Sequence, residues 1–112
     1  MGIYRMFSEN QELSHLVRLT PEQFEAHKEW SPANKWRFVE YPVGKFFDWH
    51  PVIGKCIIVV LSGKLEIEVT DGTKNVFITG DMRILSDHGK GHTSRVIGDE
   101  PVKLLVVDLP ED

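Results

Sequence analysis

The segment CIIVVLSGKLEIEVTDG, residues 56–72, carries the strongest structural signal in the chain. Its first six residues are apolar and mostly β-branched, which indicates a strand buried on both faces. After a turn at residues 62–63, apolar residues alternate with glutamates over residues 65–69, the pattern of a strand with one face in the core. Asp71-Gly72 then predicts a tight hairpin, because both central residues of such a turn need positive φ. The segment therefore predicts a β-rich fold.

The same pattern extends to both sides of this segment. From Trp36 onward, short β-rich runs alternate with glycine, proline and aspartate at intervals typical of sandwiches and barrels. About eight short, mostly antiparallel strands must bury their inward faces, and a two-layer sandwich or closed barrel does this while leaving few open edges. The further predicted strands are 3–7, 13–19, 76–78, 82–85, 92–97 and 102–107.

One helix is expected near the amino terminus. Thr20-Pro21-Glu22-Gln23 combines an N-cap hydroxyl, a proline suited to the first helical turn, and a glutamine at the position a capping box needs. The sequence predicts a helix over residues 21–30 that ends at Ser31-Pro32, because a residue before proline is disfavoured in helical geometry. The fold class is therefore all-β with one short peripheral helix.

Length and composition describe one ordinary folded domain. The chain has 112 residues, of which 41% are hydrophobic and 27% charged, so one hydrophobic core over residues 1–112 is expected. The formal net charge is −4, and the lysines and arginines are scattered rather than clustered. This argues against nucleic acid as a partner, which favours a basic patch, and is compatible with an anionic small ligand.

Cysteine usage and hydropathy give an expected cellular location. Cys56 is the only cysteine, so no intramolecular disulfide can form and a reducing, intracellular setting is the simplest interpretation. The first residues lack the apolar stretch of a signal peptide, and no segment is long enough to span a bilayer. We expect a soluble, cytoplasmic protein with no membrane partner.

Two segments, from Gly44 to Gly63 and from Gly80 to His92, carry glycines and a histidine at regular spacing. The segment from Gly44 to Gly63 is similar to the first cupin motif, with His50 in the place of its first histidine. The second motif begins at Gly80-Asp81 and ends at a histidine that corresponds to His92 in Gly89-Lys90-Gly91-His92-Thr93. The resemblance covers residues 36–109. It implies a double-stranded β-helix, or jelly-roll barrel, whose core is 36–109, preceded by strands and a helix in 1–35.

The resemblance also implies a metal site, of which half is retained. Cupin metal sites use three histidines and one glutamate to hold iron, manganese, zinc or nickel. Here Val52 replaces the second histidine and Cys56 the glutamate. Asp48 lies two residues before His50, so in one extended strand its carboxylate is expected beside that histidine, with His92 opposite. The predicted metal ligands are therefore His50, His92 and Asp48.

A metal-free pocket is the alternative, and we favour it. In that case Asp48 is a surface or hydrogen-bonding residue and the two histidines line the pocket as polar groups. Cys56 could bind a metal as a thiolate, but in an apolar strand a packed, inert thiol is the better default. No divalent metal is then needed, and Asp48 and Cys56 remain candidate ligand-binding residues.

Acid–base chemistry is the function that the retained histidines suggest. Imidazole titrates near neutral pH, so His50 and His92 are the candidate catalytic residues, although they could simply hydrogen-bond a ligand. Arg83, Lys90 and Arg95 could orient an anionic substrate, but isolated cations are more often solvated surface groups. No nucleophile elbow, phosphate loop or dinucleotide fingerprint is present.

Two functions follow from this sequence. The first is a small-molecule enzyme of isomerase, lyase or cyclase type that acts on a polar or carbonyl compound by proton transfer or with a metal. The second is a non-catalytic cupin that senses a ligand or binds a partner. Small cupins often dimerise, which would protect exposed strand edges, so a homodimer is expected in either case.

Overall fold

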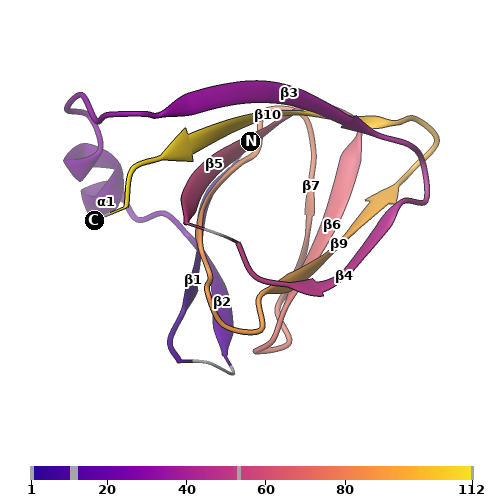
Figure 1. The fold of residues 1–112 in the computed structure, drawn as a ribbon, viewed down its shortest axis with the longest axis horizontal. Helices are drawn as coiled ribbons and strands as arrows, with labels where there is room; N and C mark the ends of the chain where they lie inside the picture. The colour runs from indigo at the N-terminus through magenta and orange to yellow at the C-terminus, as the bar shows by residue number, and fades with distance from the viewer. Residues whose placement is uncertain (1, 11–12, 53, 112) are drawn as a thin grey trace.

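The computed structural model describes residues 2–10, 13–52 and 54–111, which form two β-sheets and one short helix (Figure 1). The six-stranded sheet has the order β2-β1-β8-β5-β10-β3, and the four-stranded sheet has the order β4-β9-β6-β7. The elements are β1 (Ile3–Ser8), β2 (Ser14–Arg18), α1 (Pro21–Ala26), β3 (Lys35–Tyr41), β4 (Phe46–His50), β5 (Lys55–Ser62), β6 (Lys64–Val69), β7 (Lys74–Phe77), β8 (Met82–Ser86), β9 (His92–Ile97) and β10 (Val102–Leu109). The predicted all-β jelly roll is confirmed.

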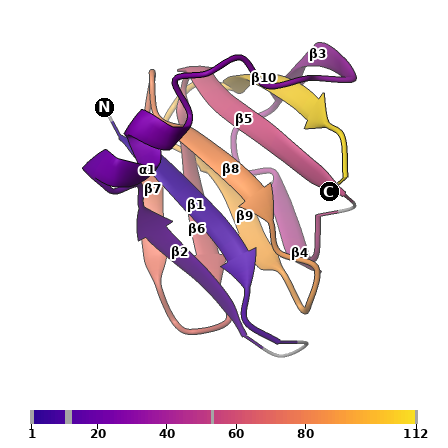
Figure 2. The ribbon, with the colours of Figure 1, turned by 90° about the vertical axis from the view of Figure 1, so that its left-hand side faces the viewer.

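The hydrophobic core lies between the two sheets. Met6, Val60 and Leu85 enter it from the six-stranded sheet, and Ile67 and Phe77 enter it from the four-stranded sheet; each has at most 1% of its surface exposed. The amino-terminal strands take part fully, because β1 pairs in parallel with β8. The barrel therefore extends beyond the predicted 36–109 core to include β1 and β2 (Figure 2).

The central segment folds as predicted in outline and differs in two details. The strand β5 is not buried on both faces: Cys56 and Val60 are buried, whereas Leu61 is 42% exposed on the outer face. The hairpin between β6 and β7 has only one residue with positive φ, Gly72 at +93°. Asp71 instead keeps an ordinary φ and accepts a hydrogen bond from the Thr73 N–H at 2.8 Å, which closes the turn without a second left-handed residue.

The helix begins as predicted and ends early. The capping box is present, with the Gln23 N–H donating to Thr20 Oγ1 at 3.1 Å and the Thr20 N–H donating to Gln23 Oε1 at 2.9 Å. The helix ends at Ala26 rather than at Trp30, whose side chain is fully exposed. Because the helix buries no side chain, no tertiary packing stabilises a further turn. In the described residues, no helix has the length and apolar character that a membrane span requires.

Candidate functional site

A cavity of about 110 Å³ lies between the two sheets. Six apolar side chains from β3, β4, β5, β6 and β10 form most of its wall, and five polar side chains reach it. An apolar lining with a few convergent polar groups is the usual character of a small-molecule site. The polar residues are Tyr41, His50, Arg83, His92 and Ser94.

His92 is held in the cavity wall by a buried carboxylate. Its Nδ1 lies 2.7 Å from Oδ2 of Asp87, and the two side chains are only 4% and 0% exposed. Burial lowers the pKa of His92 below its usual 6.5, although the hydrogen bond to Asp87 opposes this shift. The imidazole is therefore neutral at pH 7. With Nδ1 donating to the carboxylate, the lone pair resides on Nε2, the arrangement of an oriented general base.

His50 faces the same cavity because β4 is irregular. The register between β4 and β9 shifts between Phe47 and His50. Both side chains line the cavity although two residues lie between them, whereas a regular strand has one residue between neighbours on the same face. The Nδ1 of His50 donates to the backbone carbonyl of Asp48 at 2.7 Å, since a carbonyl can only accept. The His50 and His92 rings lie 4.4 Å apart between centroids. The two histidines predicted from the motifs therefore meet.

Gly91 makes this approach possible. It has a φ of +81°, and a Cβ at this position would overlap the backbone carbonyl of His50. Glycine both adopts this left-handed conformation without strain and leaves space for the end of β4. The glycine before His92 therefore determines how closely the two histidines lie.

Arg83 supplies a positive charge to the wall of the cavity. It is 2% exposed, and its Nε and Nη1 have no hydrogen-bond partner among the described residues. Burial lowers the pKa of Arg83 to about 10, so the guanidinium remains protonated at neutral pH. Arg83 is one of the predicted ligand-binding cations, and it lies in the cavity wall.

Four other predicted residues lie outside the cavity lining. Asp48 is exposed and does not share the inward face of His50, because the irregularity in β4 breaks the expected alternation. Arg95 is exposed and its guanidinium stacks 4.4 Å from the ring centre of Phe46. Lys90 is exposed in the loop before β9. Cys56 is buried in the core.

The residues present do not fit the metal cage that the fold family implies. No group of three or more histidine, cysteine, aspartate or glutamate side chains is placed to hold a metal ion within residues 2–10, 13–52 and 54–111. Burial raises the pKa of the Cys56 thiol to about 11, so it is a poor source of thiolate. The buried cation Arg83 in the same wall also opposes a divalent cation between His50 and His92.

Sequence reasoning missed Asp87 and Ser94. Asp87 follows β8 directly and lies in a run of aspartate, glycine and lysine that reads as a solvated loop. Its position five residues before a motif histidine is the only signal that could have identified it. Ser94 lies two residues after His92 in β9, so strand alternation alone places it on the same face.

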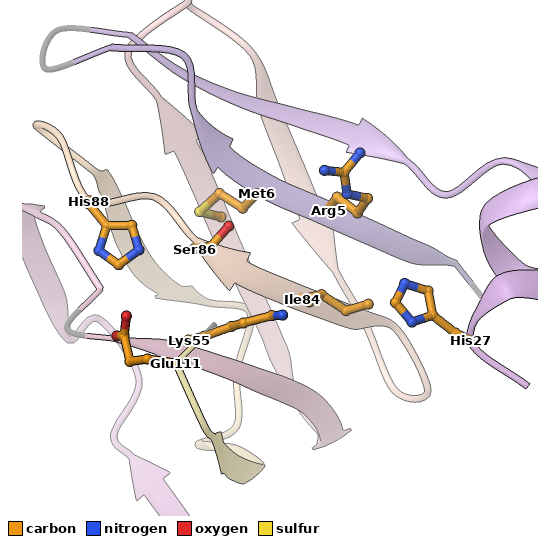
Figure 3. Close-up of a pocket in the computed structure, with 8 residues that line it drawn as sticks. All are labelled: Arg5, Met6, His27, Lys55, Ile84, Ser86, His88 and Glu111. Atoms are coloured by element: carbon orange, nitrogen blue, oxygen red, sulfur yellow. The ribbon is translucent and has the colours of Figure 1, made fainter. Parts of the chain in front are cut away.

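A larger groove, of about 340 Å³, lies elsewhere on the molecule (Figure 3). It runs along the outer face of the six-stranded sheet and includes Arg5, Lys55 and the two histidines His27 and His88. Figure 3 shows these side chains spread along the groove from several elements rather than directed at one point. His88 therefore lines this outer groove and not the interior cavity. The interior cavity is the better candidate site despite its smaller volume.

Solved structures share this fold. A Thermotoga maritima protein of the DUF861 family is 28% identical over 78% of this chain and 89% of its own, with a TM-score of 0.52. A cupin-2 domain protein from Shewanella frigidimarina is 21% identical over 80% and 90% of the two chains, with a TM-score of 0.52. A Salmonella typhimurium protein assigned to ethanolamine utilization protein Q is 16% identical over 100% and 98%, with a TM-score of 0.55.

No protein-family model and no curated protein matches the sequence. The fold is therefore identified by structure and by the two motifs. The jelly roll brings His50 and His92 of those motifs together in its interior, with their rings tilted at 57° to each other. Together with the solved structures that share its architecture, this arrangement shows that the chain has the cupin fold.

Proposed function

We propose that this protein is a small-molecule enzyme that moves a proton on a polar or carbonyl compound, as an isomerase or lyase does. The observation that supports it most directly is the buried hydrogen bond of 2.7 Å between Asp87 and His92 at the wall of the cavity. A neutral imidazole oriented by a carboxylate is suited to abstract a proton from a bound ligand.

Each histidine has a separate part in this reaction. His92 accepts the proton on Nε2, and Asp87 stabilises the imidazolium that forms. The proton then passes from Nε2 of His92 to another atom of the same ligand, which restores the neutral imidazole. His50 lies 4.4 Å from the His92 ring, and because its Nδ1–H is bonded to the carbonyl of Asp48, its neutral ring presents a lone pair on Nε2 that can accept a hydrogen bond from the ligand. The proton leaves and rejoins one ligand, so the isomerisation balances without a redox step.

Hydrogen–deuterium exchange tests this proposal without knowledge of the natural substrate. A panel of small aldehydes, ketones and 2-oxo acids is incubated with the protein in D₂O, and loss of the proton next to the carbonyl is followed by ¹H NMR. We expect accelerated exchange in at least one compound. His92→Gln should reduce the rate about 10²- to 10⁴-fold, the usual contribution of a general base.

Arg95→Met is the matched control, because Arg95 is exposed and lies on β9 with His92 but outside the cavity. Its exchange rate should equal that of the unmodified protein. The proposal is wrong if a compound binds in the cavity and no panel member exchanges faster than in protein-free buffer. That result favours the second function, a non-catalytic cupin that senses a ligand.

A further inference from the structure

The guanidinium of Arg83 has hydrogen-bonding capacity that the protein does not use. Arg83 comes from β8 in the six-stranded sheet, and its Nε and Nη1 are buried without a partner among the described residues. One contact it does make is with an aromatic ring, since its Cζ lies 5.5 Å from the ring centre of Phe77. A ring face attracts a cation but accepts no directed pair of N–H bonds from the fork of a guanidinium.

The carboxylate that acts on Arg83 in the described part of the chain does not complete the pair. Asp87 acts on Arg83 through space, but its Oδ2 bonds to His92 and its Oδ1 has no hydrogen-bond partner among the residues that the structure describes. A buried charge without a bonded counter-ion is unfavourable, and proteins retain such groups mainly where they have a function. The unfavourable energy is relieved if an anion from outside the chain binds to Arg83.

We propose that the cavity binds small carboxylates and that Arg83 is the group that receives the carboxylate. This inference rests on the proposed function and names the substrate class of the same site. A planar carboxylate matches the guanidinium fork, because two parallel N–H bonds can reach its two oxygens. The His50 and His92 rings line the same cavity, so the atoms next to the carboxylate lie beside His92, which transfers the proton, and His50, which accepts a hydrogen bond.

The size of the cavity limits the ligand. A volume of about 110 Å³ equals the share of roughly four water molecules at about 30 Å³ each. This accommodates a carboxylate with one or two further carbon atoms, whereas a sugar or nucleotide would extend out of the cavity. The remainder of the wall is apolar, with Phe47 and Ile58 among its residues, so a short hydrocarbon or carbonyl group fits beside the charge.

Propionate and its uncharged analogue propionamide test the proposal. The two probes have nearly the same shape, and only propionate carries a charge. Binding to the full-length protein is measured at pH 7.5 and low salt by ¹H–¹⁵N NMR, including the Nε–Hε signal of Arg83. We expect propionate to bind about 10- to 100-fold more tightly than propionamide, the usual effect of a charge-assisted hydrogen bond, and to shift the Arg83 signal.

Two variants separate a binding role from a structural one. Arg83→Met keeps an unbranched apolar side chain and removes the unpaired charge, so the ligand-free variant should melt at the same temperature as the unmodified protein or higher. Its affinity for propionate should fall about 10- to 100-fold. Arg95→Met, which removes an exposed cation, should bind propionate as the unmodified protein does.

The proposal is overturned if propionamide binds the unmodified protein as tightly as propionate, or if Arg83→Met binds propionate within twofold of the unmodified protein. The probe comparison needs no variant, so it decides the question if Arg83→Met does not fold. These outcomes are separate from failure of the proposed enzyme function. Propionate can bind through Arg83 although no compound exchanges its proton, and exchange can occur in a protein that does not select for charge.

Discussion

Replacing Gly91 by alanine should separate the two histidines and destabilise the fold. Gly91 has a φ of +81°, and strain of this kind costs roughly 1–3 kcal/mol in a residue with a side chain. The new Cβ also overlaps the carbonyl of His50, and overpacking against a backbone that cannot rotate away costs about another 1–3 kcal/mol. The expected loss of unfolding free energy is therefore about 2–6 kcal/mol.

Gly72→Ala isolates the steric part of this loss. Gly72 has a similar φ of +93°, but a Cβ there meets nothing within 4 Å. The two variants therefore share the backbone strain, and the difference between them measures the overlap with His50. Urea denaturation should give a loss for Gly91→Ala larger by about 1–3 kcal/mol. Equal losses in the two variants would refute the view that Gly91 is required by the close approach of His50.

Four further predictions concern ionisation, the thiol, assembly and metal. Because burial lowers the pKa of His92 below 6.5, the unfolded chain binds a proton there more readily than the folded one, so stability should fall as the pH drops below about 6.5. In urea denaturation between pH 5 and 8, the unfolding free energy of His92→Gln should decline less at low pH than that of the unmodified protein. Hydrogen bonds to carboxylates raise the pKa of His15, which has the opposite effect on stability. Because His15 is present in both proteins, its contribution cancels in the comparison. An equal decline in both proteins would contradict this. The pKa of the Cys56 thiol is about 11 instead of 9.0, so at pH 8 the folded protein should react with iodoacetamide at least about a hundredfold more slowly than the urea-unfolded chain. Equal rates in the two states would show that the thiol is accessible in the folded protein. Sedimentation at micromolar concentration should give twice the monomer mass, because β3 is an edge strand with two exposed aromatic side chains; a monomer mass would rule out the homodimer. Elemental analysis of tag-free protein should find well below one equivalent of iron, manganese, zinc or nickel. One equivalent in the unmodified protein that is absent from His50→Ala would instead support the metal site predicted from the motifs.

Most of the strand pattern could be predicted because it depends on local alternation. Residues 65–69 alternate in the sequence, and in β6 the apolar side chains Leu65, Ile67 and Val69 are the buried ones. The irregularity in β4 could not be predicted, since Asp48-Trp49 carries no glycine or proline to signal it. The helix was predicted too long because its caps are encoded locally, whereas its length depends on packing that the exposed Trp30 does not make.

The site was predictable where it follows motif spacing and not where it depends on burial. Glycine spacing identified His50 and His92, and the structure brings their rings together. It could not identify Asp87, because an aspartate in a polar loop becomes a buried partner of His92 only after the strands on both sides of that loop enter different sheets. The burial of Arg83 is likewise a tertiary property, and composition alone ranked it equally with the exposed Arg95.

The replacement of the motif glutamate by Cys56 affects Arg83 on the neighbouring strand β8. Arg83 pairs in register with Ile58, two residues along β5 from Cys56, and the cysteine and the arginine interact through space. A glutamate at position 56 would be a diagonal cross-strand neighbour of Arg83 and a candidate counter-ion within the chain. With cysteine there, β5 offers no carboxylate at this position, and Asp87 acts on Arg83 only through space. Under our proposal, the substitution that removes a metal ligand from the motif also leaves Arg83 open to the carboxylate of a bound molecule.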